Sequence, residues 1–174
     1  MIIKMNKKGQ VWISAALYTA LGVILVTLIL SVGMPFVDKL KARNTILQTK
    51  GVMYDFDEII RTVNLEGLGS RRPLYVDIGE GDFLIDSEND KLIWSFFAED
   101  QLGIEPDLPN PIKEGNLNMQ STSLGQGYRI ELFLDYSNEN VDIEAPNLKL
   151  LSGKYNLVAE HRYETSDFVE IREA

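Results

Sequence analysis

The sequence predicts an α+β protein, in which one long hydrophobic helix near the amino terminus is followed by an antiparallel, β-rich globular head. Two observations support this class. No residue from Gly9 to Val37 is charged, which favours a single long apolar helix. From residue 73 onward, apolar side chains instead recur at every second position, as in strands. We therefore expect a hydrophobic helix at residues 10–36, an amphipathic extension at 37–68 and a head domain at 69–174.

Charge is distributed unevenly along the chain. The whole chain of 174 residues carries −9, whereas residues 1–43 hold six lysines or arginines against one acid and carry +5. The remaining 131 residues therefore carry −14. Such an acidic body does not neutralise phosphates, so we expect no nucleic-acid partner. The chain has no cysteine, which excludes both a disulfide framework and a thiolate metal site.

The apolar run is long enough to cross a lipid bilayer. Its 24 residues from Val11 to Met34 make about 36 Å of α-helix, compared with a hydrocarbon core of about 30 Å. A cleaved secretory signal has a shorter apolar region, about 7–15 residues, and ends in a small-residue cleavage site. Because this run continues well past Gly22, we expect it to stay in the mature protein as a membrane-spanning helix.

Small residues gather in the first half of this run. They are Ala15, Ala16, Thr19, Ala20 and Gly22. Two pairs among them are four residues apart, which places the members of each pair on one side of a helix. Small side chains at this spacing let helix backbones pack closely in lipid. The alternative is that alanine is present simply as a good helix former, and the spacing does not separate the two explanations.

The residues that stand directly before the run are Lys7, Lys8, Gly9 and Gln10. A basic leader that ends in glycine and is followed by glutamine and an uninterrupted apolar helix resembles the class III signal peptide of archaeal type IV pilins. The resemblance implies that residues 1–9 are a cytoplasmic leader and that a prepilin peptidase cleaves between Gly9 and Gln10. Glycine suits such a site because it has no Cβ, and lysines favour the cytoplasmic side. The alternative is an uncut signal anchor.

The resemblance covers about residues 4–66, and beyond them only the overall plan is shared. It departs from the family pattern at the fifth position after the cut, where Ser14 stands in place of the glutamate that many pilins carry. Whether the chain is a major or a minor pilin is left open by this difference.

The resemblance also implies a function. The chain would be a structural subunit of an archaeal type IV pilus-like filament, with its head outside the cell and no enzymatic activity. The implied partners are membrane lipid before assembly, the prepilin peptidase, other pilin subunits, a platform protein and a cytoplasmic assembly ATPase. The alternative function is a solitary, single-pass membrane-anchored extracellular binding module that does not polymerise.

Beyond the apolar run, the residue spacing predicts that the helix continues. Apolar residues recur mostly at intervals of three, four or seven and predict one stripe that packs on the head. This stripe comprises Val37, Leu40, Leu47, Met53, Phe56, Ile60 and Val63. The opposite side is expected to be polar and to carry Lys39, Arg43, Lys50, Asp57 and Glu58. Glycines after Asn64 predict the end of the helix.

Alternating residues predict the strands of the head. The runs 74–78, 83–86 and 91–97 are separated by polar turns and predict a three-stranded meander. Residues 128–136 predict a long strand, and residues 168–172 a final one. Residues 148–151 and 155–163 predict a hairpin through Ser152 and Gly153. The proline-containing segment 98–120 is expected to be a long loop.

No group of residues predicts catalysis. His161 is the single histidine and alternates with apolar strand residues, which favours a structural role. Asp86, Glu88 and Asp90 are the best candidates for a calcium site, but an EF-hand loop would also need glycine and glutamate where Lys91 and Phe97 stand. We therefore expect a solvated turn there, and neither a metal nor a cofactor.

Overall fold

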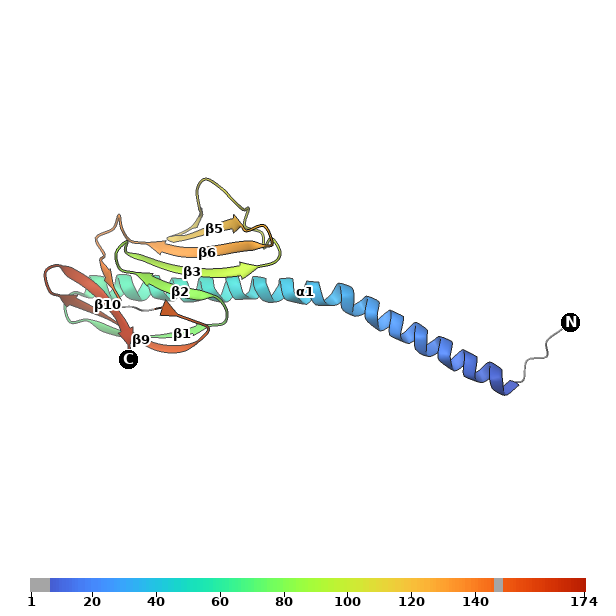
Figure 1. Ribbon diagram of the computed structural model, residues 1–174. Helices are drawn as coiled ribbons and strands as arrows, with labels where there is room; N and C mark the ends of the chain where they lie inside the picture. The colour runs from blue at the N-terminus through green and yellow to red at the C-terminus, as the bar shows by residue number, and fades with distance from the viewer. Residues whose placement is uncertain (1–6, 146–148) are drawn as a thin grey trace. The chain divides into compact units, whose positions relative to one another are not determined.

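The structure, a computed structural model, describes residues 7–145 and 149–174. Within them it contains one helix followed by ten strands in two mostly antiparallel sheets (Figure 1). The predicted α+β class, with a long apolar helix and a β-rich head, is confirmed. Residues 1–6 of the predicted leader and Leu148 of the predicted strand 148–151 lie outside the described residues.

Helix α1 runs from Lys7 to Glu66, a length of 60 residues, and passes through Pro35. It ends where Gly67 and Gly69 adopt φ angles of 87° and 83°, which glycine tolerates because it has no Cβ. The chain forms two compact units, residues 1–41 and 42–174. The last part of α1, residues 42–66, therefore belongs to the same unit as the strands.

The first sheet has four strands and the second has six. In spatial order, the first consists of β1 (Arg71–Ile78), β9 (Gly153–Tyr163), β10 (Asp167–Glu173) and β7 (Ile143–Glu144). The second consists of β4 (Ile112–Glu114), β5 (Leu117–Ser123), β6 (Tyr128–Asp135), β3 (Lys91–Ala98), β2 (Asp82–Asp86) and β8 (Lys149–Leu150). Among the described residues, all neighbouring strands are antiparallel except β10 and β7.

Two predicted strand pairings are wrong because the chain crosses between the sheets. Strands β2 and β3 pair as the predicted meander requires, but β1 pairs with β9 in the other sheet. Strands β8 and β9 do not form the predicted hairpin either, since β8 pairs with β2. The chain crosses between the sheets after β1 and again between β8 and β9. These two crossings lie side by side, as a hydrogen bond of 2.9 Å from the Ser152 hydroxyl to the carbonyl of Gly79 shows.

Glycine is required at the β1–β2 crossing. Gly81 has a φ of 93°, and a Cβ there would lie 2.7 Å from the Trp94 ring nitrogen and 2.6 Å from the Ser95 carbonyl oxygen. The same Trp94 nitrogen donates a hydrogen bond of 2.9 Å to the carbonyl of Glu80. A Cβ at Gly81 would therefore collide with the indole and with the β3 backbone, and the turn requires glycine.

The predicted loop 98–120 is also partly wrong, since it contains β4 and the beginning of β5. On β5 the side chains of Leu117, Met119 and Ser121 are buried. Burial therefore recurs at every second residue of β5, but one of these buried residues is a serine, and Asn118 between them is buried as well. A pattern based on apolar residues alone therefore misses this strand.

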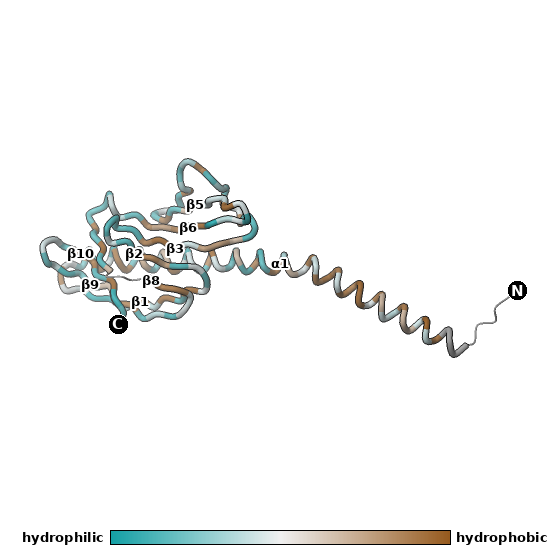
Figure 2. Tube along the Cα trace, viewed as in Figure 1, coloured by the Kyte–Doolittle hydropathy of each residue, from teal (hydrophilic) through white to brown (hydrophobic). Residues whose placement is uncertain are grey.

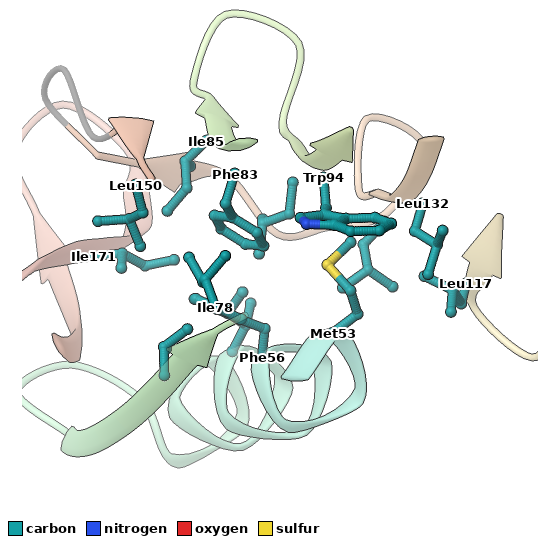
Figure 3. Close-up of a cluster of buried hydrophobic side chains, with 14 of the residues drawn as sticks. Met53, Phe56, Ile78, Phe83, Ile85, Trp94, Leu117, Leu132, Leu150 and Ile171 are labelled. Atoms are coloured by element: carbon teal, nitrogen blue, oxygen red, sulfur yellow. The ribbon is translucent and has the colours of Figure 1, made fainter. Parts of the chain in front are cut away.

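One hydrophobic core joins α1 to both sheets (Figure 3). Met53 and Phe56 of α1 are fully buried, and the Phe56 ring stacks on Phe83 of β2 with 4.8 Å between centroids. Ile78 and Ile171 bring in the other sheet from β1 and β10. Each element thereby buries its apolar face against another element, which is the general requirement for a stable domain.

The predicted stripe on α1 is correct only in its second half. Met53, Phe56, Ile60 and Val63 are buried, whereas Val37, Leu40 and Leu47 are 44%, 49% and 66% exposed. Leu47 and Met53 are six residues apart, and with 3.6 residues per turn they lie far apart around the helix. Ile46 and Thr49, at the proper spacing from Met53, are buried instead.

Candidate functional site on the long helix

The candidate site is the amino-terminal part of α1, and its first turn holds the predicted junction. Helix α1 begins at Lys7, so Lys7, Lys8, Gly9 and Gln10 are helical. The bond between Gly9 and Gln10 directly precedes the apolar segment, which we define as residues 11–37. Cleavage at this bond stays a prediction.

The apolar segment is exposed along its length. From Val11 to Val37 every side chain is exposed except at Gly33, which is partly exposed. Figure 2 shows that the residues of this part of α1 are largely hydrophobic, whereas hydrophobic and hydrophilic residues are mixed along the strands. Within the described residues, one helix is long and apolar enough to cross a membrane, judged by length and composition. An uncharged surface of this extent is unfavourable in water, and a helix of this length and composition could anchor the chain in a membrane.

Three hydroxyl groups of the apolar segment form hydrogen bonds within the helix. Thr19 donates to the carbonyl of Ala15, Thr27 to that of Val23 and Ser31 to that of Leu28, each over 2.9 Å. A hydroxyl without a partner would be costly in hydrocarbon, and a bond to the preceding turn removes that cost. These three residues are therefore compatible with an apolar environment.

The predicted packing residues lie on this segment. Ala15, Ala16, Thr19, Ala20 and Gly22 are all helical and exposed. A Cβ added to Gly22 would meet no atom within 4 Å. Their surface is thus open to close approach by another helix, while the choice between helix packing and simple helix propensity is still untested.

The carboxy-terminal part of α1 is attached to the strands by a polar cluster that sequence reasoning missed. The Asp57 carboxylate accepts hydrogen bonds from Arg61 Nε at 2.8 Å, from the Tyr136 hydroxyl at 2.9 Å and from Asn116 Nδ2 at 2.7 Å. Asp57 was expected on the polar, outward side, but it is only 8% exposed. The sequence signal was its position directly beside the buried Phe56, with Arg61 four residues later.

Arg61 extends this cluster to the end of β6. Its guanidinium forms an ion pair of 2.6 Å with Glu139 and lies 5.5 Å from the centre of the Tyr136 ring. Burial and the neighbouring Asp57 charge raise the pKa of Tyr136 well above its ordinary value. Both factors disfavour the phenolate. The hydroxyl therefore keeps its proton and stays a donor to Asp57.

A second polar contact attaches α1 at Lys50. Lys50 Nζ lies 2.5 Å from Glu114 Oε2, and the Tyr54 hydroxyl donates to Glu114 Oε1 over 3.0 Å. The hydrogen bond from Lys50, followed by that from Tyr54, lowers the pKa of Glu114. Lys50 was expected on the outward polar side, but it is partly buried and bound to β4.

Removing the Tyr136 hydroxyl tests the role of the polar cluster. Tyr136→Phe leaves one oxygen of the buried Asp57 with one donor fewer, so we expect the free energy of unfolding to fall by about 1–3 kcal/mol. Thermal unfolding of the full-length protein in detergent, followed by near-ultraviolet circular dichroism, measures this change. Tyr163→Phe is the matched control, because Tyr163 is 63% exposed. Equal unfolding midpoints for the two variants would rule out a stabilising role for this hydrogen bond.

Asp86 and Asp90, which were considered above as calcium ligands, form hydrogen bonds that hold the fold together. Asp86 accepts hydrogen bonds from the backbone of Glu88 and Asn89 within the β2–β3 turn. Asp90 accepts one from the Ile143 backbone nitrogen at 2.9 Å, and so attaches β7 to this turn. Within residues 7–145 and 149–174, no three acidic or histidine side chains are grouped to hold a metal ion.

His161 lies inside the first sheet on β9 and is 6% exposed. Among the described residues, neither ring nitrogen has a hydrogen-bond partner, and the nearest carboxylate oxygen, that of Asp167, is 4.0 Å from Nε2. This buried position supports the predicted structural role for the side chain.

Comparisons with known proteins do not place the chain in a family. No protein-family model matches it, and no curated protein or solved structure was found to be similar. Any function must therefore be argued from the residues and the fold themselves.

Proposed function

We propose that the chain is a structural subunit of an archaeal type IV pilus-like surface filament, processed by a prepilin peptidase and assembled through its amino-terminal helix. The observation that carries the proposal is that a basic junction ending in glycine and an apolar segment follow one another at the start of α1. Lys7, Lys8, Gly9 and Gln10 directly precede an exposed, uncharged segment, three of whose hydroxyls bond within the helix. A β-rich head follows on the same helix.

The physical basis of the proposal is the fate of the apolar segment after cleavage. A cut after Gly9 removes the lysines that precede the segment, namely Lys4, Lys7 and Lys8, and leaves a new amino terminus at Gln10. The helix then remains joined to the head. It can leave lipid only if other apolar helices cover it, which a bundle of identical helices provides.

The small residues would lie where such helices meet. Ala15, Thr19 and Gly22 present little bulk, so neighbouring backbones can approach closely. The partners in this proposal are membrane lipid before assembly, the prepilin peptidase, other pilin subunits, a platform protein and an assembly ATPase. The head would be exposed outside the cell, and Ser14 would take the place of the family's glutamate at the core.

The alternative is a solitary membrane-anchored extracellular module with the same topology. Its supporting observation is Ser14, since the glutamate that many pilins carry is missing. Assembly separates the two functions. We expect the processed chain in filaments sheared from the surface of cells that produce it, detected by an antibody to the head and by electron microscopy. Recovery of the chain only as a membrane-bound monomer would support the alternative and contradict the filament.

A further inference from the structure

An apolar pocket lies beside α1 in the unit formed by residues 42–174. It has a volume of about 420 Å³. We call it the socket and define it by Arg43, Leu47, Leu102, Ile104, Ile112 and Met119. The socket lies within the range of about 300–1,000 Å³ typical of ligand pockets, so it is large enough for one aromatic side chain.

The socket combines apolar walls with a free cation at its rim. Leu47 is 66% exposed and Ile112 is 37% exposed, so the apolar wall of the socket is open to solvent. Within the described residues Arg43 has no ion-pair partner, whereas Lys50, two turns further along α1, is bound to Glu114. The socket therefore suits an apolar or aromatic group that is accompanied by carboxylates.

A surface with those properties occurs on the same chain. Tyr75 lies on β1, an edge strand of the first sheet, and is 75% exposed. Asp55 and Glu58 of α1 line the same shallow groove as Tyr75. Neither carboxylate has an ion-pair or hydrogen-bond partner among the described residues. We call Tyr75, Asp55 and Glu58 the acidic knob.

The socket and the knob cannot meet within one copy. Arg43 and Asp55 lie on one continuous helix, twelve residues apart, which corresponds to about 18 Å along the axis. We propose that the knob of one copy enters the socket of the next copy, with the Tyr75 ring against Leu47 and Ile112. In this contact Arg43 faces the ring and the carboxylates of Asp55 and Glu58, an arrangement that favours both cation–π attraction and ion pairing.

The symmetry of this contact agrees with a filament. The two surfaces are different, so the contact is heterologous, and such contacts repeat as an open helix unless the rotation happens to close a ring. The heads are acidic overall and repel one another, so the meeting of a cation with carboxylates selects this orientation. The inference rests on the proposed function, because it specifies which head surfaces touch along the filament.

Disulfide cross-linking tests the contact cleanly because the chain has no cysteine. Two full-length copies with different tags, one Tyr75→Cys and the other Ile112→Cys, are produced together with a prepilin peptidase and then oxidised. We expect a cross-linked dimer that carries both tags. Tyr163→Cys paired with Ile112→Cys is the control, since Tyr163 is 63% exposed but belongs to neither surface. If the Tyr75 pair cross-links no more than the control, the inference is wrong.

Charge reversal provides a second test that does not depend on cysteine chemistry. Arg43→Glu brings like charges together and is expected to lower the yield of sheared filaments about tenfold or more. Adding Asp55→Lys and Glu58→Lys to the same chain should restore most of the yield. Reversal of the exposed pair Asp82 and Lys149, which belongs to neither surface, is the control and should leave the yield unchanged. Absence of rescue would contradict the contact.

The outcomes separate this inference from the proposed function. Filaments without the Tyr75–Ile112 cross-link would overturn the contact and leave the filament proposal standing. A cross-link between chains that form no filament would support the contact and remove the filament proposal.

Discussion

Replacing Gly9 with valine is expected to leave the leader attached to essentially every chain. In the proposed function the peptidase must reach the backbone between Gly9 and Gln10, and a β-branched side chain obstructs that backbone where glycine leaves it open. The unprocessed chain keeps Lys7 and Lys8 at the end of its helix, so filaments should be absent as well. Immunoblots of cells that contain the peptidase show processing as a downward shift in mass.

A control for this variant lies in the same helix. Gly22→Ala adds a Cβ that meets no atom within 4 Å, and it lies well away from the cut, so processing should be unchanged. Cleavage of the Gly9→Val chain at the same bond and at the same rate would show that the glycine is not read, and the resemblance to a class III signal would lose its chemical basis.

Replacing Phe56 with alanine is expected to lower the free energy of unfolding by about 3–5 kcal/mol, the usual cost of removing a large buried ring. Phe56 is fully buried and stacks on Phe83 of β2, so its loss leaves a cavity between α1 and the second sheet. Thermal unfolding of the full-length protein in detergent, read from the near-ultraviolet signal of buried aromatic residues such as Trp94, measures the change.

Leu65→Ala is the matched control on the same helix, because Leu65 is 85% exposed and its truncation should have little effect. The Phe56→Ala variant also separates the two roles of α1, which are to complete the core of the head and to present the apolar segment. Residues 11–37 should still insert into lipid when the core has been weakened, since their apolar surface is independent of Phe56. A Phe56→Ala protein as stable as the Leu65→Ala protein would mean that α1 does not complete the core.

The fold class could be predicted from the sequence because its main signals are local. The absence of charge from Gly9 to Val37 and the alternation in residues 128–136 each report one element without reference to any other. The stripe of Met53, Phe56, Ile60 and Val63 was found for the same reason.

Features that depend on long-range partners were missed. Alternation shows which residues of β1 face inward, but the partner of β1 is β9, roughly eighty residues later. The burial of Asp57 depends on Tyr136 and Asn116, which bring it hydrogen bonds from distant strands. Leu47 fits a heptad spacing from Leu40, yet only its angular position relative to Met53 reveals that it faces away from the core.

In the candidate site, too, the features with a local sequence signal could be predicted and those that depend on distant residues could not. The apolar segment and its small residues were located from the sequence, and the structure adds that Thr19 and Ser31 bond within the helix. The socket could not be predicted, because Arg43 and Leu47 on α1 meet Leu102 and Ile112 only in the folded chain.

The most direct test of the account is the mass of the amino-terminal peptide of the protein recovered from its native membrane or filament. Peptide-bond cleavage after Gly9 predicts a chain that begins at Gln10, with the whole apolar segment still attached to the head. A chain that still begins at Met1, or one that has lost residues 11–37, would contradict it.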